Sequence, residues 1–125
     1  MAKRILVVED NDLNRKLFCD VLRANGYTVE PVADGDKVIE AALAFGPDLV
    51  IMDIQLPHVS GLDLITQMRI NPALSAIPVL AVTAYAGTGD EEKIRDAGAQ
   101  GYLAKPVSIR PFMNAINALL TPEAA

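Results

Sequence analysis

The sequence of 125 residues is 51% hydrophobic and carries a formal net charge of −5, which suits one domain with its own hydrophobic core. The single cysteine, Cys19, excludes an internal disulfide, and no apolar stretch reaches the ~18 residues that a membrane span needs. Because lysines and arginines are scattered rather than clustered, nucleic-acid binding is disfavoured, and we expect one cytoplasmic domain over residues 1–125.

The basic N-terminus is followed by a short apolar run, Ile5–Val8. Four apolar residues are too few for a signal peptide, which needs ~7–15, but they are typical of a strand that is buried on both faces. A helix should follow, with Asp12 as its N-cap and Gly26 at its end. The apolar residues of this helix recur at helical spacing: Leu13, Leu17, Phe18, Val21 and Leu22.

The second strand gives the first indication of topology. Tyr27–Val32 has the composition of a strand, but Pro31 has no N–H to donate to a neighbouring strand. We therefore expect this strand at an edge of the sheet. A helix should follow and stop at Gly46-Pro47, with apolar residues at Val38, Ile39, Ala42 and Leu43.

The third and fourth strands both end in polar residues. Leu49–Met52 predicts a buried strand that runs straight into Asp53, and Pro78–Val82 predicts a strand that ends at Thr83. The loop after Asp53 contains turn-forming residues. The helix between the two strands is marked by three apolar residues: Leu62, Ile65 and Met68.

The C-terminal part repeats the pattern. A short helix over Glu91–Ala97 precedes a strand over Gly101–Ala104, which leads into Lys105. Ser108 should cap the last helix. That helix should bury six apolar residues: Ile109, Phe112, Met113, Ile116, Leu119 and Leu120.

Strand and helix thus alternate five times, which predicts an α/β fold of doubly wound (βα)5 type, with a parallel five-stranded sheet and helices on both faces. Two strand orders are common for such folds, 3-2-1-4-5 and 2-1-3-4-5. Because Pro31 favours an edge position for the second strand, the sequence favours the flavodoxin-like order 2-1-3-4-5.

The polar residues at the strand ends predict a site, because ligands of such sheets bind beyond the carboxyl ends of the strands. Three carboxylates in one place repel each other, and a hard cation removes that repulsion. Mg²⁺ prefers oxygen ligands, often carboxylates together with water and substrate phosphate. The residues at the strand ends are Glu9, Asp10, Asp53, Thr83 and Lys105.

Asp53 is the best-placed nucleophile of this set, because it follows a buried strand. Thr83 could donate a hydrogen bond to a phosphoryl oxygen, and Lys105 could neutralise another. An aspartate, threonine or lysine that stands alone after a strand is more often a helix cap or a surface residue. The joint occurrence of all of them at one sheet edge favours a magnesium-dependent phosphoryl-transfer site.

These residues make the sequence resemble a response-regulator receiver domain over essentially its whole length. The stretches 9–14 and 53–57 most resemble stand-alone members that control cell division. The motifs that carry the resemblance are Val8-Glu9-Asp10-Asn11, Met52-Asp53-Ile54-Gln55-Leu56-Pro57 with Gly61, Val82-Thr83-Ala84 and Lys105-Pro106.

The resemblance implies a role for each residue of the site. Asp53 would accept a phosphoryl group from a phosphohistidine on a histidine kinase or a phosphotransfer protein. Mg²⁺, for which Mn²⁺ could substitute, would be held by Asp10, Asp53, the backbone carbonyl of Gln55 and, through water, Glu9. The phosphoryl oxygens would be bound by Thr83, the N–H of Ala84 and Lys105, and the Lys105-Pro106 peptide bond would be cis.

The resemblance also implies how the signal is passed on. Phosphorylation would draw Thr83 towards the phosphoryl group and turn Tyr102 inward, together with the helix near 90–97 and the loop before it. A target protein would bind the face formed by this helix, the fifth strand and the last helix. A kinase would dock near Asn14, Arg15 and Phe18, although Phe18 could equally belong to the core. We expect a monomer, leave phosphorylation-dependent dimerisation open, and expect no turnover of small substrates.

Three alternatives fit the pattern less well. A haloacid-dehalogenase-type phosphatase needs a second aspartate at the position of Gln55. An FMN binder of flavodoxin type needs a phosphate-binding loop where this sequence has the acidic stretch 9–12. A scaffold that only resembles a receiver domain would usually lack Asp53, Thr83 or Lys105, and all three are present.

Overall fold

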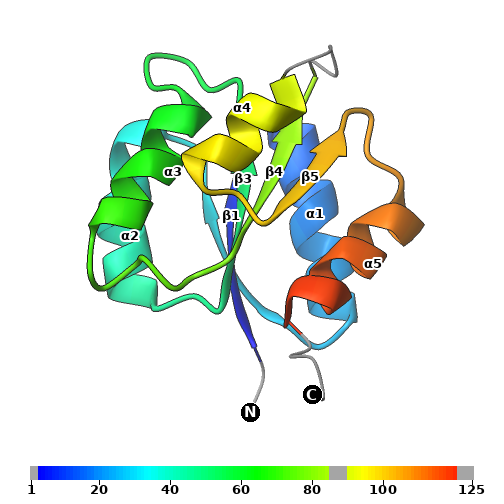
Figure 1. Ribbon diagram of the computed structural model, residues 1–125. Coiled ribbons are helices and arrows are strands. Elements are labelled where there is room, and N and C mark those ends of the chain that lie inside the picture. Colours follow the sequence, from blue (N-terminus) through cyan, green and yellow to red (C-terminus); the bar gives the residue numbers. More distant parts are fainter. Residues whose placement is uncertain (1–2, 85–89, 121–125) are drawn as a thin grey trace, which may run out of the picture.

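The computed structural model describes residues 3–84 and 90–120 and contains a five-stranded parallel sheet in the order β2-β1-β3-β4-β5 (Figure 1). The predicted fold class and strand order are confirmed. The elements in chain order are β1 (Arg4–Val8), α1 (Asp12–Ala24), β2 (Thr28–Val32), the 3-10 turn η1 (Gly35–Lys37), α2 (Val38–Phe45), β3 (Leu49–Asp53), α3 (Gly61–Ile70), β4 (Val79–Thr83), α4 (Asp90–Ala97), β5 (Gly101–Ala104) and α5 (Ile109–Leu120).

The sheet separates two layers of helices. In Figure 1, α2, α3 and α4 cover one face, and α1 and α5 cover the other. Side chains of the inner strands alternate between the two cores: Val50 and Met52 of β3 pack with α3, whereas Leu49 and Ile51 pack with α1 and α5. Because both faces are covered, β3 is buried along its whole length.

The edge position of β2 is also confirmed. Pro31 stands opposite Val7 in the parallel register with β1, and its other side has no neighbouring strand. A proline is tolerated there because its missing N–H leaves no sheet partner unsatisfied. The helix that follows, α2, ends at Gly46, whose φ of 65° lies in the left-handed region that favours glycine.

One expectation for α1 was wrong. Its N-cap is Asn11 rather than Asp12, because the Asn11 side chain accepts a hydrogen bond from the N–H of Asn14 at 2.9 Å. Phe18, for which the sequence allowed either docking or a place in the core, belongs to the core, since it is 4% exposed and stacks on Phe112 with ring centroids 4.8 Å apart. In α5 the expected burial of Ile109 was wrong, because this first residue of the helix is 55% exposed.

The part of the molecule around α4 and β5 is covered less deeply. No residue of β5 is fully buried, and Ile94 is the one buried residue of α4. Arg69 of α3 fastens this part by hydrogen bonds from its guanidinium to the carbonyls of Gly98, Ser75 and Ile77 at 3.0, 2.9 and 2.7 Å. One long cation thus satisfies several loop carbonyls that would otherwise need water.

Among the residues described, no helix is both long and apolar enough to cross a membrane. The tail over residues 121–125 and most of the loop before α4 (residues 85–89) lie outside the described residues.

Candidate functional site

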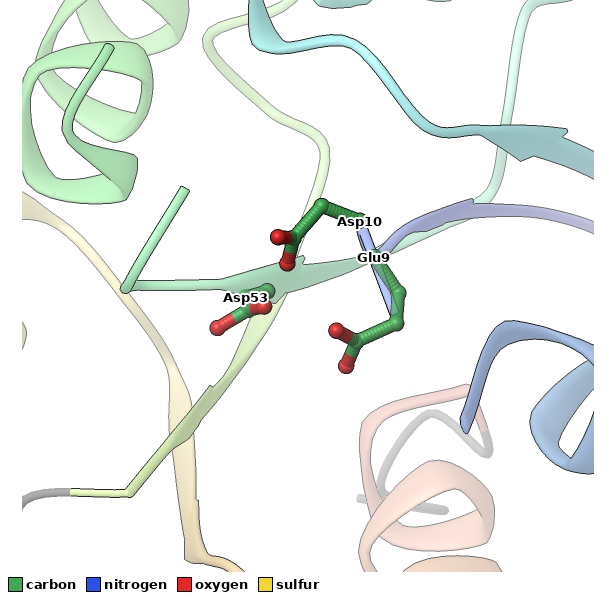
Figure 2. Close-up of side chains that lie close together, drawn as sticks. All are labelled: Glu9, Asp10 and Asp53. Atoms are coloured by element: carbon green, nitrogen blue, oxygen red, sulfur yellow. The ribbon is translucent and has the colours of Figure 1, made fainter. Parts of the chain in front are cut away.

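Three carboxylates gather at the carboxyl ends of the two central strands, β1 and β3 (Figure 2). Glu9 and Asp10 directly follow β1, and Asp53 is the last residue of β3. Because Val8 and Met52 stand opposite each other in the parallel register, the residues after them meet at the same edge. Each of the three offers a carboxylate oxygen within 4.8 Å of the others.

The three carboxylates differ in exposure. Glu9 and Asp53 are 0% and 1% exposed, whereas Asp10 lies at the surface. Backbone N–H groups donate to one oxygen of each buried carboxylate: Asn11 to Oε2 of Glu9 at 3.2 Å, and Gln55 to Oδ1 of Asp53 at 3.0 Å. These bonds fix the orientation of both side chains.

The second oxygen of each buried carboxylate forms no hydrogen bond within the described part of the chain, although it lies 3.2 Å from the ammonium of Lys105. These two atoms are Oε1 of Glu9 and Oδ2 of Asp53. Buried carboxylate oxygens without a hydrogen bond are uncommon, and an ion is one of the partners that satisfies them. Hard oxygen donors in this number are what Mg²⁺ or Mn²⁺ prefers, so the residues fit a divalent cation.

Lys105 closes the site from the side of β5. Its Nζ lies 3.2 Å from Oε1 of Glu9 and 3.2 Å from Oδ2 of Asp53. Burial by itself lowers the pKa of Lys105, but the two carboxylates outweigh burial and raise the pKa above its ordinary value. The ammonium group therefore stays charged, and the peptide bond that joins Lys105 to Pro106 is cis.

Asp53 is the most perturbed carboxyl group of the site. Its pKa is raised to about 7: burial is the largest cause, the neighbouring Glu9 adds to the shift, and Lys105 opposes it. Without a cation, this side chain is therefore close to half-protonated at neutral pH. A cation beside it would favour the ionised carboxylate.

Thr83 and Ala84 come from the neighbouring strand. Thr83 is the last residue of β4 and is 1% exposed, and Ala84 follows it at the surface. Because Val82 pairs with Asp53 in the register of β3 and β4, Thr83 and Ala84 lie beside the carboxylates. The structure therefore brings together all the residues that the sequence predicted at the strand ends.

Gln55 contributes a contact that the sequence did not predict. Its side-chain Nε2 donates to Oγ1 of Thr83, and its Oε1 accepts from the N–H of Ala84 at 2.7 Å. From the sequence, Gln55 was expected to offer its backbone carbonyl to the cation, and no hydrogen-bond partner was predicted for its side chain. The sequence offered one signal, a long amide side chain two residues after Asp53. This signal does not identify Thr83 and Ala84 as the hydrogen-bond partners.

The loop that carries Gln55 is closed at its base. The N–H of Gly61 donates to the carbonyl of Ile54 at 3.1 Å, so residues 54–61 form a ring beside the site. A Cβ atom on Gly61 would lie 2.5 Å from the carbonyl oxygen of Asp53, a separation that no side chain tolerates. Glycine is thus required there by the close approach of two backbone segments.

Tyr102 lies further from the carboxylates, in β5. It is half-buried and packs against the core shared by α3 and α4, and in the strand register it stands opposite Ala81 of β4. The loop residues 86–89, which the sequence linked to the movement of Thr83 and Tyr102, lie outside the described residues.

Comparison with known proteins places this site in a family. Residues 5–117 match the family model for the response regulator receiver domain. The chain is 44% identical over 120 residues to the polar-differentiation response regulator DivK of Brucella ovis, covering 96% of this chain and 98% of that protein. The expected similarity to stand-alone regulators is thereby confirmed.

Solved structures agree with this similarity. The receiver domain of the sensor histidine kinase PA1611 from Pseudomonas aeruginosa superposes with a TM-score of 0.87 at 32% identity, covering 96% of this chain and 98% of that chain, and holds a magnesium ion in its active site cleft. The chemotaxis protein CheY4 of Vibrio cholerae has a TM-score of 0.90 at 24% identity, covering 96% of this chain and 100% of that chain, and it supports the fold alone.

Proposed function

This chain belongs to the response regulator receiver family, and from that premise we propose that Asp53 accepts a phosphoryl group in a phosphorelay. The donor would be a phosphohistidine on a histidine kinase or a histidine phosphotransfer protein. The observation that carries the proposal is the pair of buried carboxylates, Glu9 and Asp53, which both form ion pairs with Lys105 at 3.2 Å. The 44% identity to DivK supports a role in cell-cycle or cell-division control.

The cation site would be formed by the carboxylates of Asp10 and Asp53, the backbone carbonyl of Gln55 and, through water, Glu9. The Mg²⁺-containing receiver domain of PA1611 supports this assignment for Mg²⁺, and Mn²⁺ has the same ligand preference. When bound, the cation supplies positive charge that stabilises the phosphoryl oxygens during transfer.

In the transfer step, a carboxylate oxygen of Asp53 attacks phosphorus. The P–N bond to the donor histidine breaks, its electron pair returns to the imidazole, and an acyl phosphate forms. The phosphoryl oxygens would be bound by the Thr83 hydroxyl, the N–H of Ala84 and the ammonium of Lys105. Water later cleaves the acyl phosphate and restores the carboxylate, so the protein acts on its own side chain rather than on a small substrate.

The signal would pass through protein contacts on the face formed by α4, β5 and α5. Within this face α4 buries one residue and β5 none, so these two elements can rearrange at a low cost in free energy. Thr83 would move towards the phosphoryl group and Tyr102 would turn into the space that Thr83 leaves. The chain would work as a monomer, and dimerisation on phosphorylation is compatible with this scheme.

The acceptor is tested by labelling. The protein is incubated with acetyl phosphate or phosphoramidate and Mg²⁺, and mass spectrometry follows an adduct that is stable in acid and labile in base. We expect the adduct on the unmodified protein and on an exposed control variant, Asp96→Asn, and none on Asp53→Asn. Equal labelling of the Asp53→Asn protein would place the acceptor elsewhere.

The coupling between Thr83 and Tyr102 needs a separate test. Thr83→Ala removes the hydroxyl but leaves Asp53, so we expect it to retain labelling. NMR of ring-labelled tyrosine should show that the Tyr102 signal shifts on phosphorylation of the unmodified protein and stays in place in Thr83→Ala. An equal shift in both proteins would reject the coupling.

A further inference from the structure

The side chain of Gln55 spans the gap between two residues that are proposed to bind phosphate. Its Oε1 accepts from the N–H of Ala84 at 2.7 Å, and its Nε2 donates to Oγ1 of Thr83. We call these two hydrogen bonds the Gln55 bridge. They join the loop after β3 to the end of β4, across 29 and 28 positions of the chain.

Hydrogen-bond chemistry fixes the orientation of this amide. The backbone N–H of Ala84 can only donate, so the oxygen of the Gln55 amide must face it and the NH₂ group must face Thr83. Thr83 is therefore an acceptor towards Gln55. Accepting from Gln55 does not use the hydrogen of the Thr83 hydroxyl, so the bond to Gln55 does not compete with donation by Thr83.

The situation at Ala84 is different, because a backbone N–H carries one hydrogen. Bound to Oε1 of Gln55, it cannot make a full hydrogen bond to a phosphoryl oxygen. The amide oxygen and the phosphoryl oxygen thus compete for the same donor. A phosphoryl group on Asp53 can be bound by Ala84 only when Gln55 has released it.

The structure offers space for the displaced side chain. A pocket of about 210 Å³ adjoins the bridge and is lined by Gln55, Thr83, Ile54, Leu62 and residues of α4: Asp90, Lys93 and Ile94. The charged residues of α4 supply polar groups at its wall. A rotation of the Gln55 side chain would therefore move it from the ends of β3 and β4 towards α4.

We propose that Gln55 is a positioning residue whose bridge holds Thr83 and Ala84 in the unphosphorylated arrangement and must open at Ala84 when Asp53 is phosphorylated. The proposal rests on the function proposed above. It implies that the phosphorylated state forms at the free-energy cost of breaking the hydrogen bond between Gln55 and the N–H of Ala84. It also links that state to α4, because the released amide enters the pocket under this helix.

The main test measures the affinity for beryllofluoride, a phosphoryl analogue, in saturating Mg²⁺. Gln55→Met keeps the length of the side chain but forms no bridge, so no hydrogen bond has to break when beryllofluoride binds. The dissociation constant of this variant for beryllofluoride should therefore be lower by about threefold to tenfold, which corresponds to one net hydrogen bond. Gln67→Met makes the same chemical change on the exposed face of α3 and should leave the affinity unchanged.

A second readout needs neither cation nor phosphoryl analogue. In the metal-free protein, the Ala84 amide should exchange slowly with solvent, and it should exchange faster in Gln55→Met and Gln55→Ala. Gln55→Glu should restore slow exchange, because its carboxylate accepts from Ala84 and from the Thr83 hydroxyl. A role in packing alone would not produce this rescue.

Two results would overturn the proposal: equal beryllofluoride affinities of the unmodified protein and Gln55→Met, or rapid Ala84 exchange in the unmodified protein. Failure of the proposed function would look different. In that case the unmodified protein would bind no beryllofluoride and would take no label, while the exchange of Ala84 would still depend on Gln55.

Discussion

The central strand β3 and the edge strand β5 each supply one charged group to the same site, but they hold it by different means. All residues of β3 are buried, and packing on both faces of the sheet fixes Asp53 at its end. No residue of β5 is fully buried, and Lys105 beyond it is held by ion pairs of 3.2 Å to Glu9 and Asp53. The comparison teaches that Asp53 is positioned by packing, whereas the opposite charge of Lys105 is positioned by electrostatics.

The largest expected effect tests the packing side of this comparison. Leu49 of β3 is fully buried and Leu103 of β5 is half-buried, and both side chains belong to the core under α1 and α5. Leu49→Ala should lower the free energy of unfolding by about 3–4 kcal/mol, and Leu103→Ala by only about 1 kcal/mol. Urea denaturation measures both values, and equal losses would contradict the distinction.

The next effect tests the electrostatic side. Because burial raises the pKa of Asp53 from 3.8 to about 7, the unfolded chain releases this proton at a lower pH than the folded protein. The stability of the metal-free protein should therefore fall as pH rises from about 4 to about 7 and then level off. Asp53→Asn removes this dependence and should be more stable than the unmodified protein at pH 8 by about 2 kcal/mol.

Denaturation in the presence of a chelator, at several pH values, measures this dependence. The control is Asp96→Asn, which removes an exposed carboxylate and should keep the pH profile of the unmodified protein. If the free energy of unfolding changes between pH 4 and 7 by the same amount in the unmodified protein and in Asp53→Asn, Asp53 does not determine the profile.

The cation should oppose the loss of stability. At pH 8, Mg²⁺ at ten times its Kd should add about 1.4 kcal/mol to the free energy of unfolding of the unmodified protein.

The smallest effect concerns how the less buried part is fastened. Arg69 donates to carbonyls of several separate loop residues, and a lysine cannot reproduce this planar set of donors. Arg69→Lys should cost about 1–2 kcal/mol. The substitution should accelerate amide exchange in α4 and β5 more than in β3. Arg110→Lys on the exposed side of α5 is the matched control. If Arg69→Lys accelerates exchange equally in β3 and β5, Arg69 does not have this local role.

The sequence was sufficient for the topology and for the strand-end residues. Periodic apolar runs located every strand, and the missing N–H of Pro31 selected the strand order, because both signals are local. The parallel sheet then brings the strand ends together at one edge. Glu9, Asp53, Thr83 and Lys105 could therefore be predicted as neighbours before any distance was known.

The remaining features depend on partners far away in the sequence. The acceptors of Arg69 are loop carbonyls, and any exposed helix position would suit an arginine equally well. The bridge of Gln55 requires the register of β3 and β4. The N-cap of α1 was missed for a local reason: Asn11 and Asp12 are both good caps, and only backbone geometry distinguishes them.

The contact at Gly61 has a consequence for how substitutions in this protein are interpreted. The residue binds nothing and has no side chain, yet any larger residue would push the start of α3 away from the backbone of Asp53 and open the ring that carries Gln55. A mutational survey that scores only signalling would rank Gly61 beside the residues that are proposed to bind phosphate. Measuring the fold and the signal separately would show that its intolerance has a steric origin.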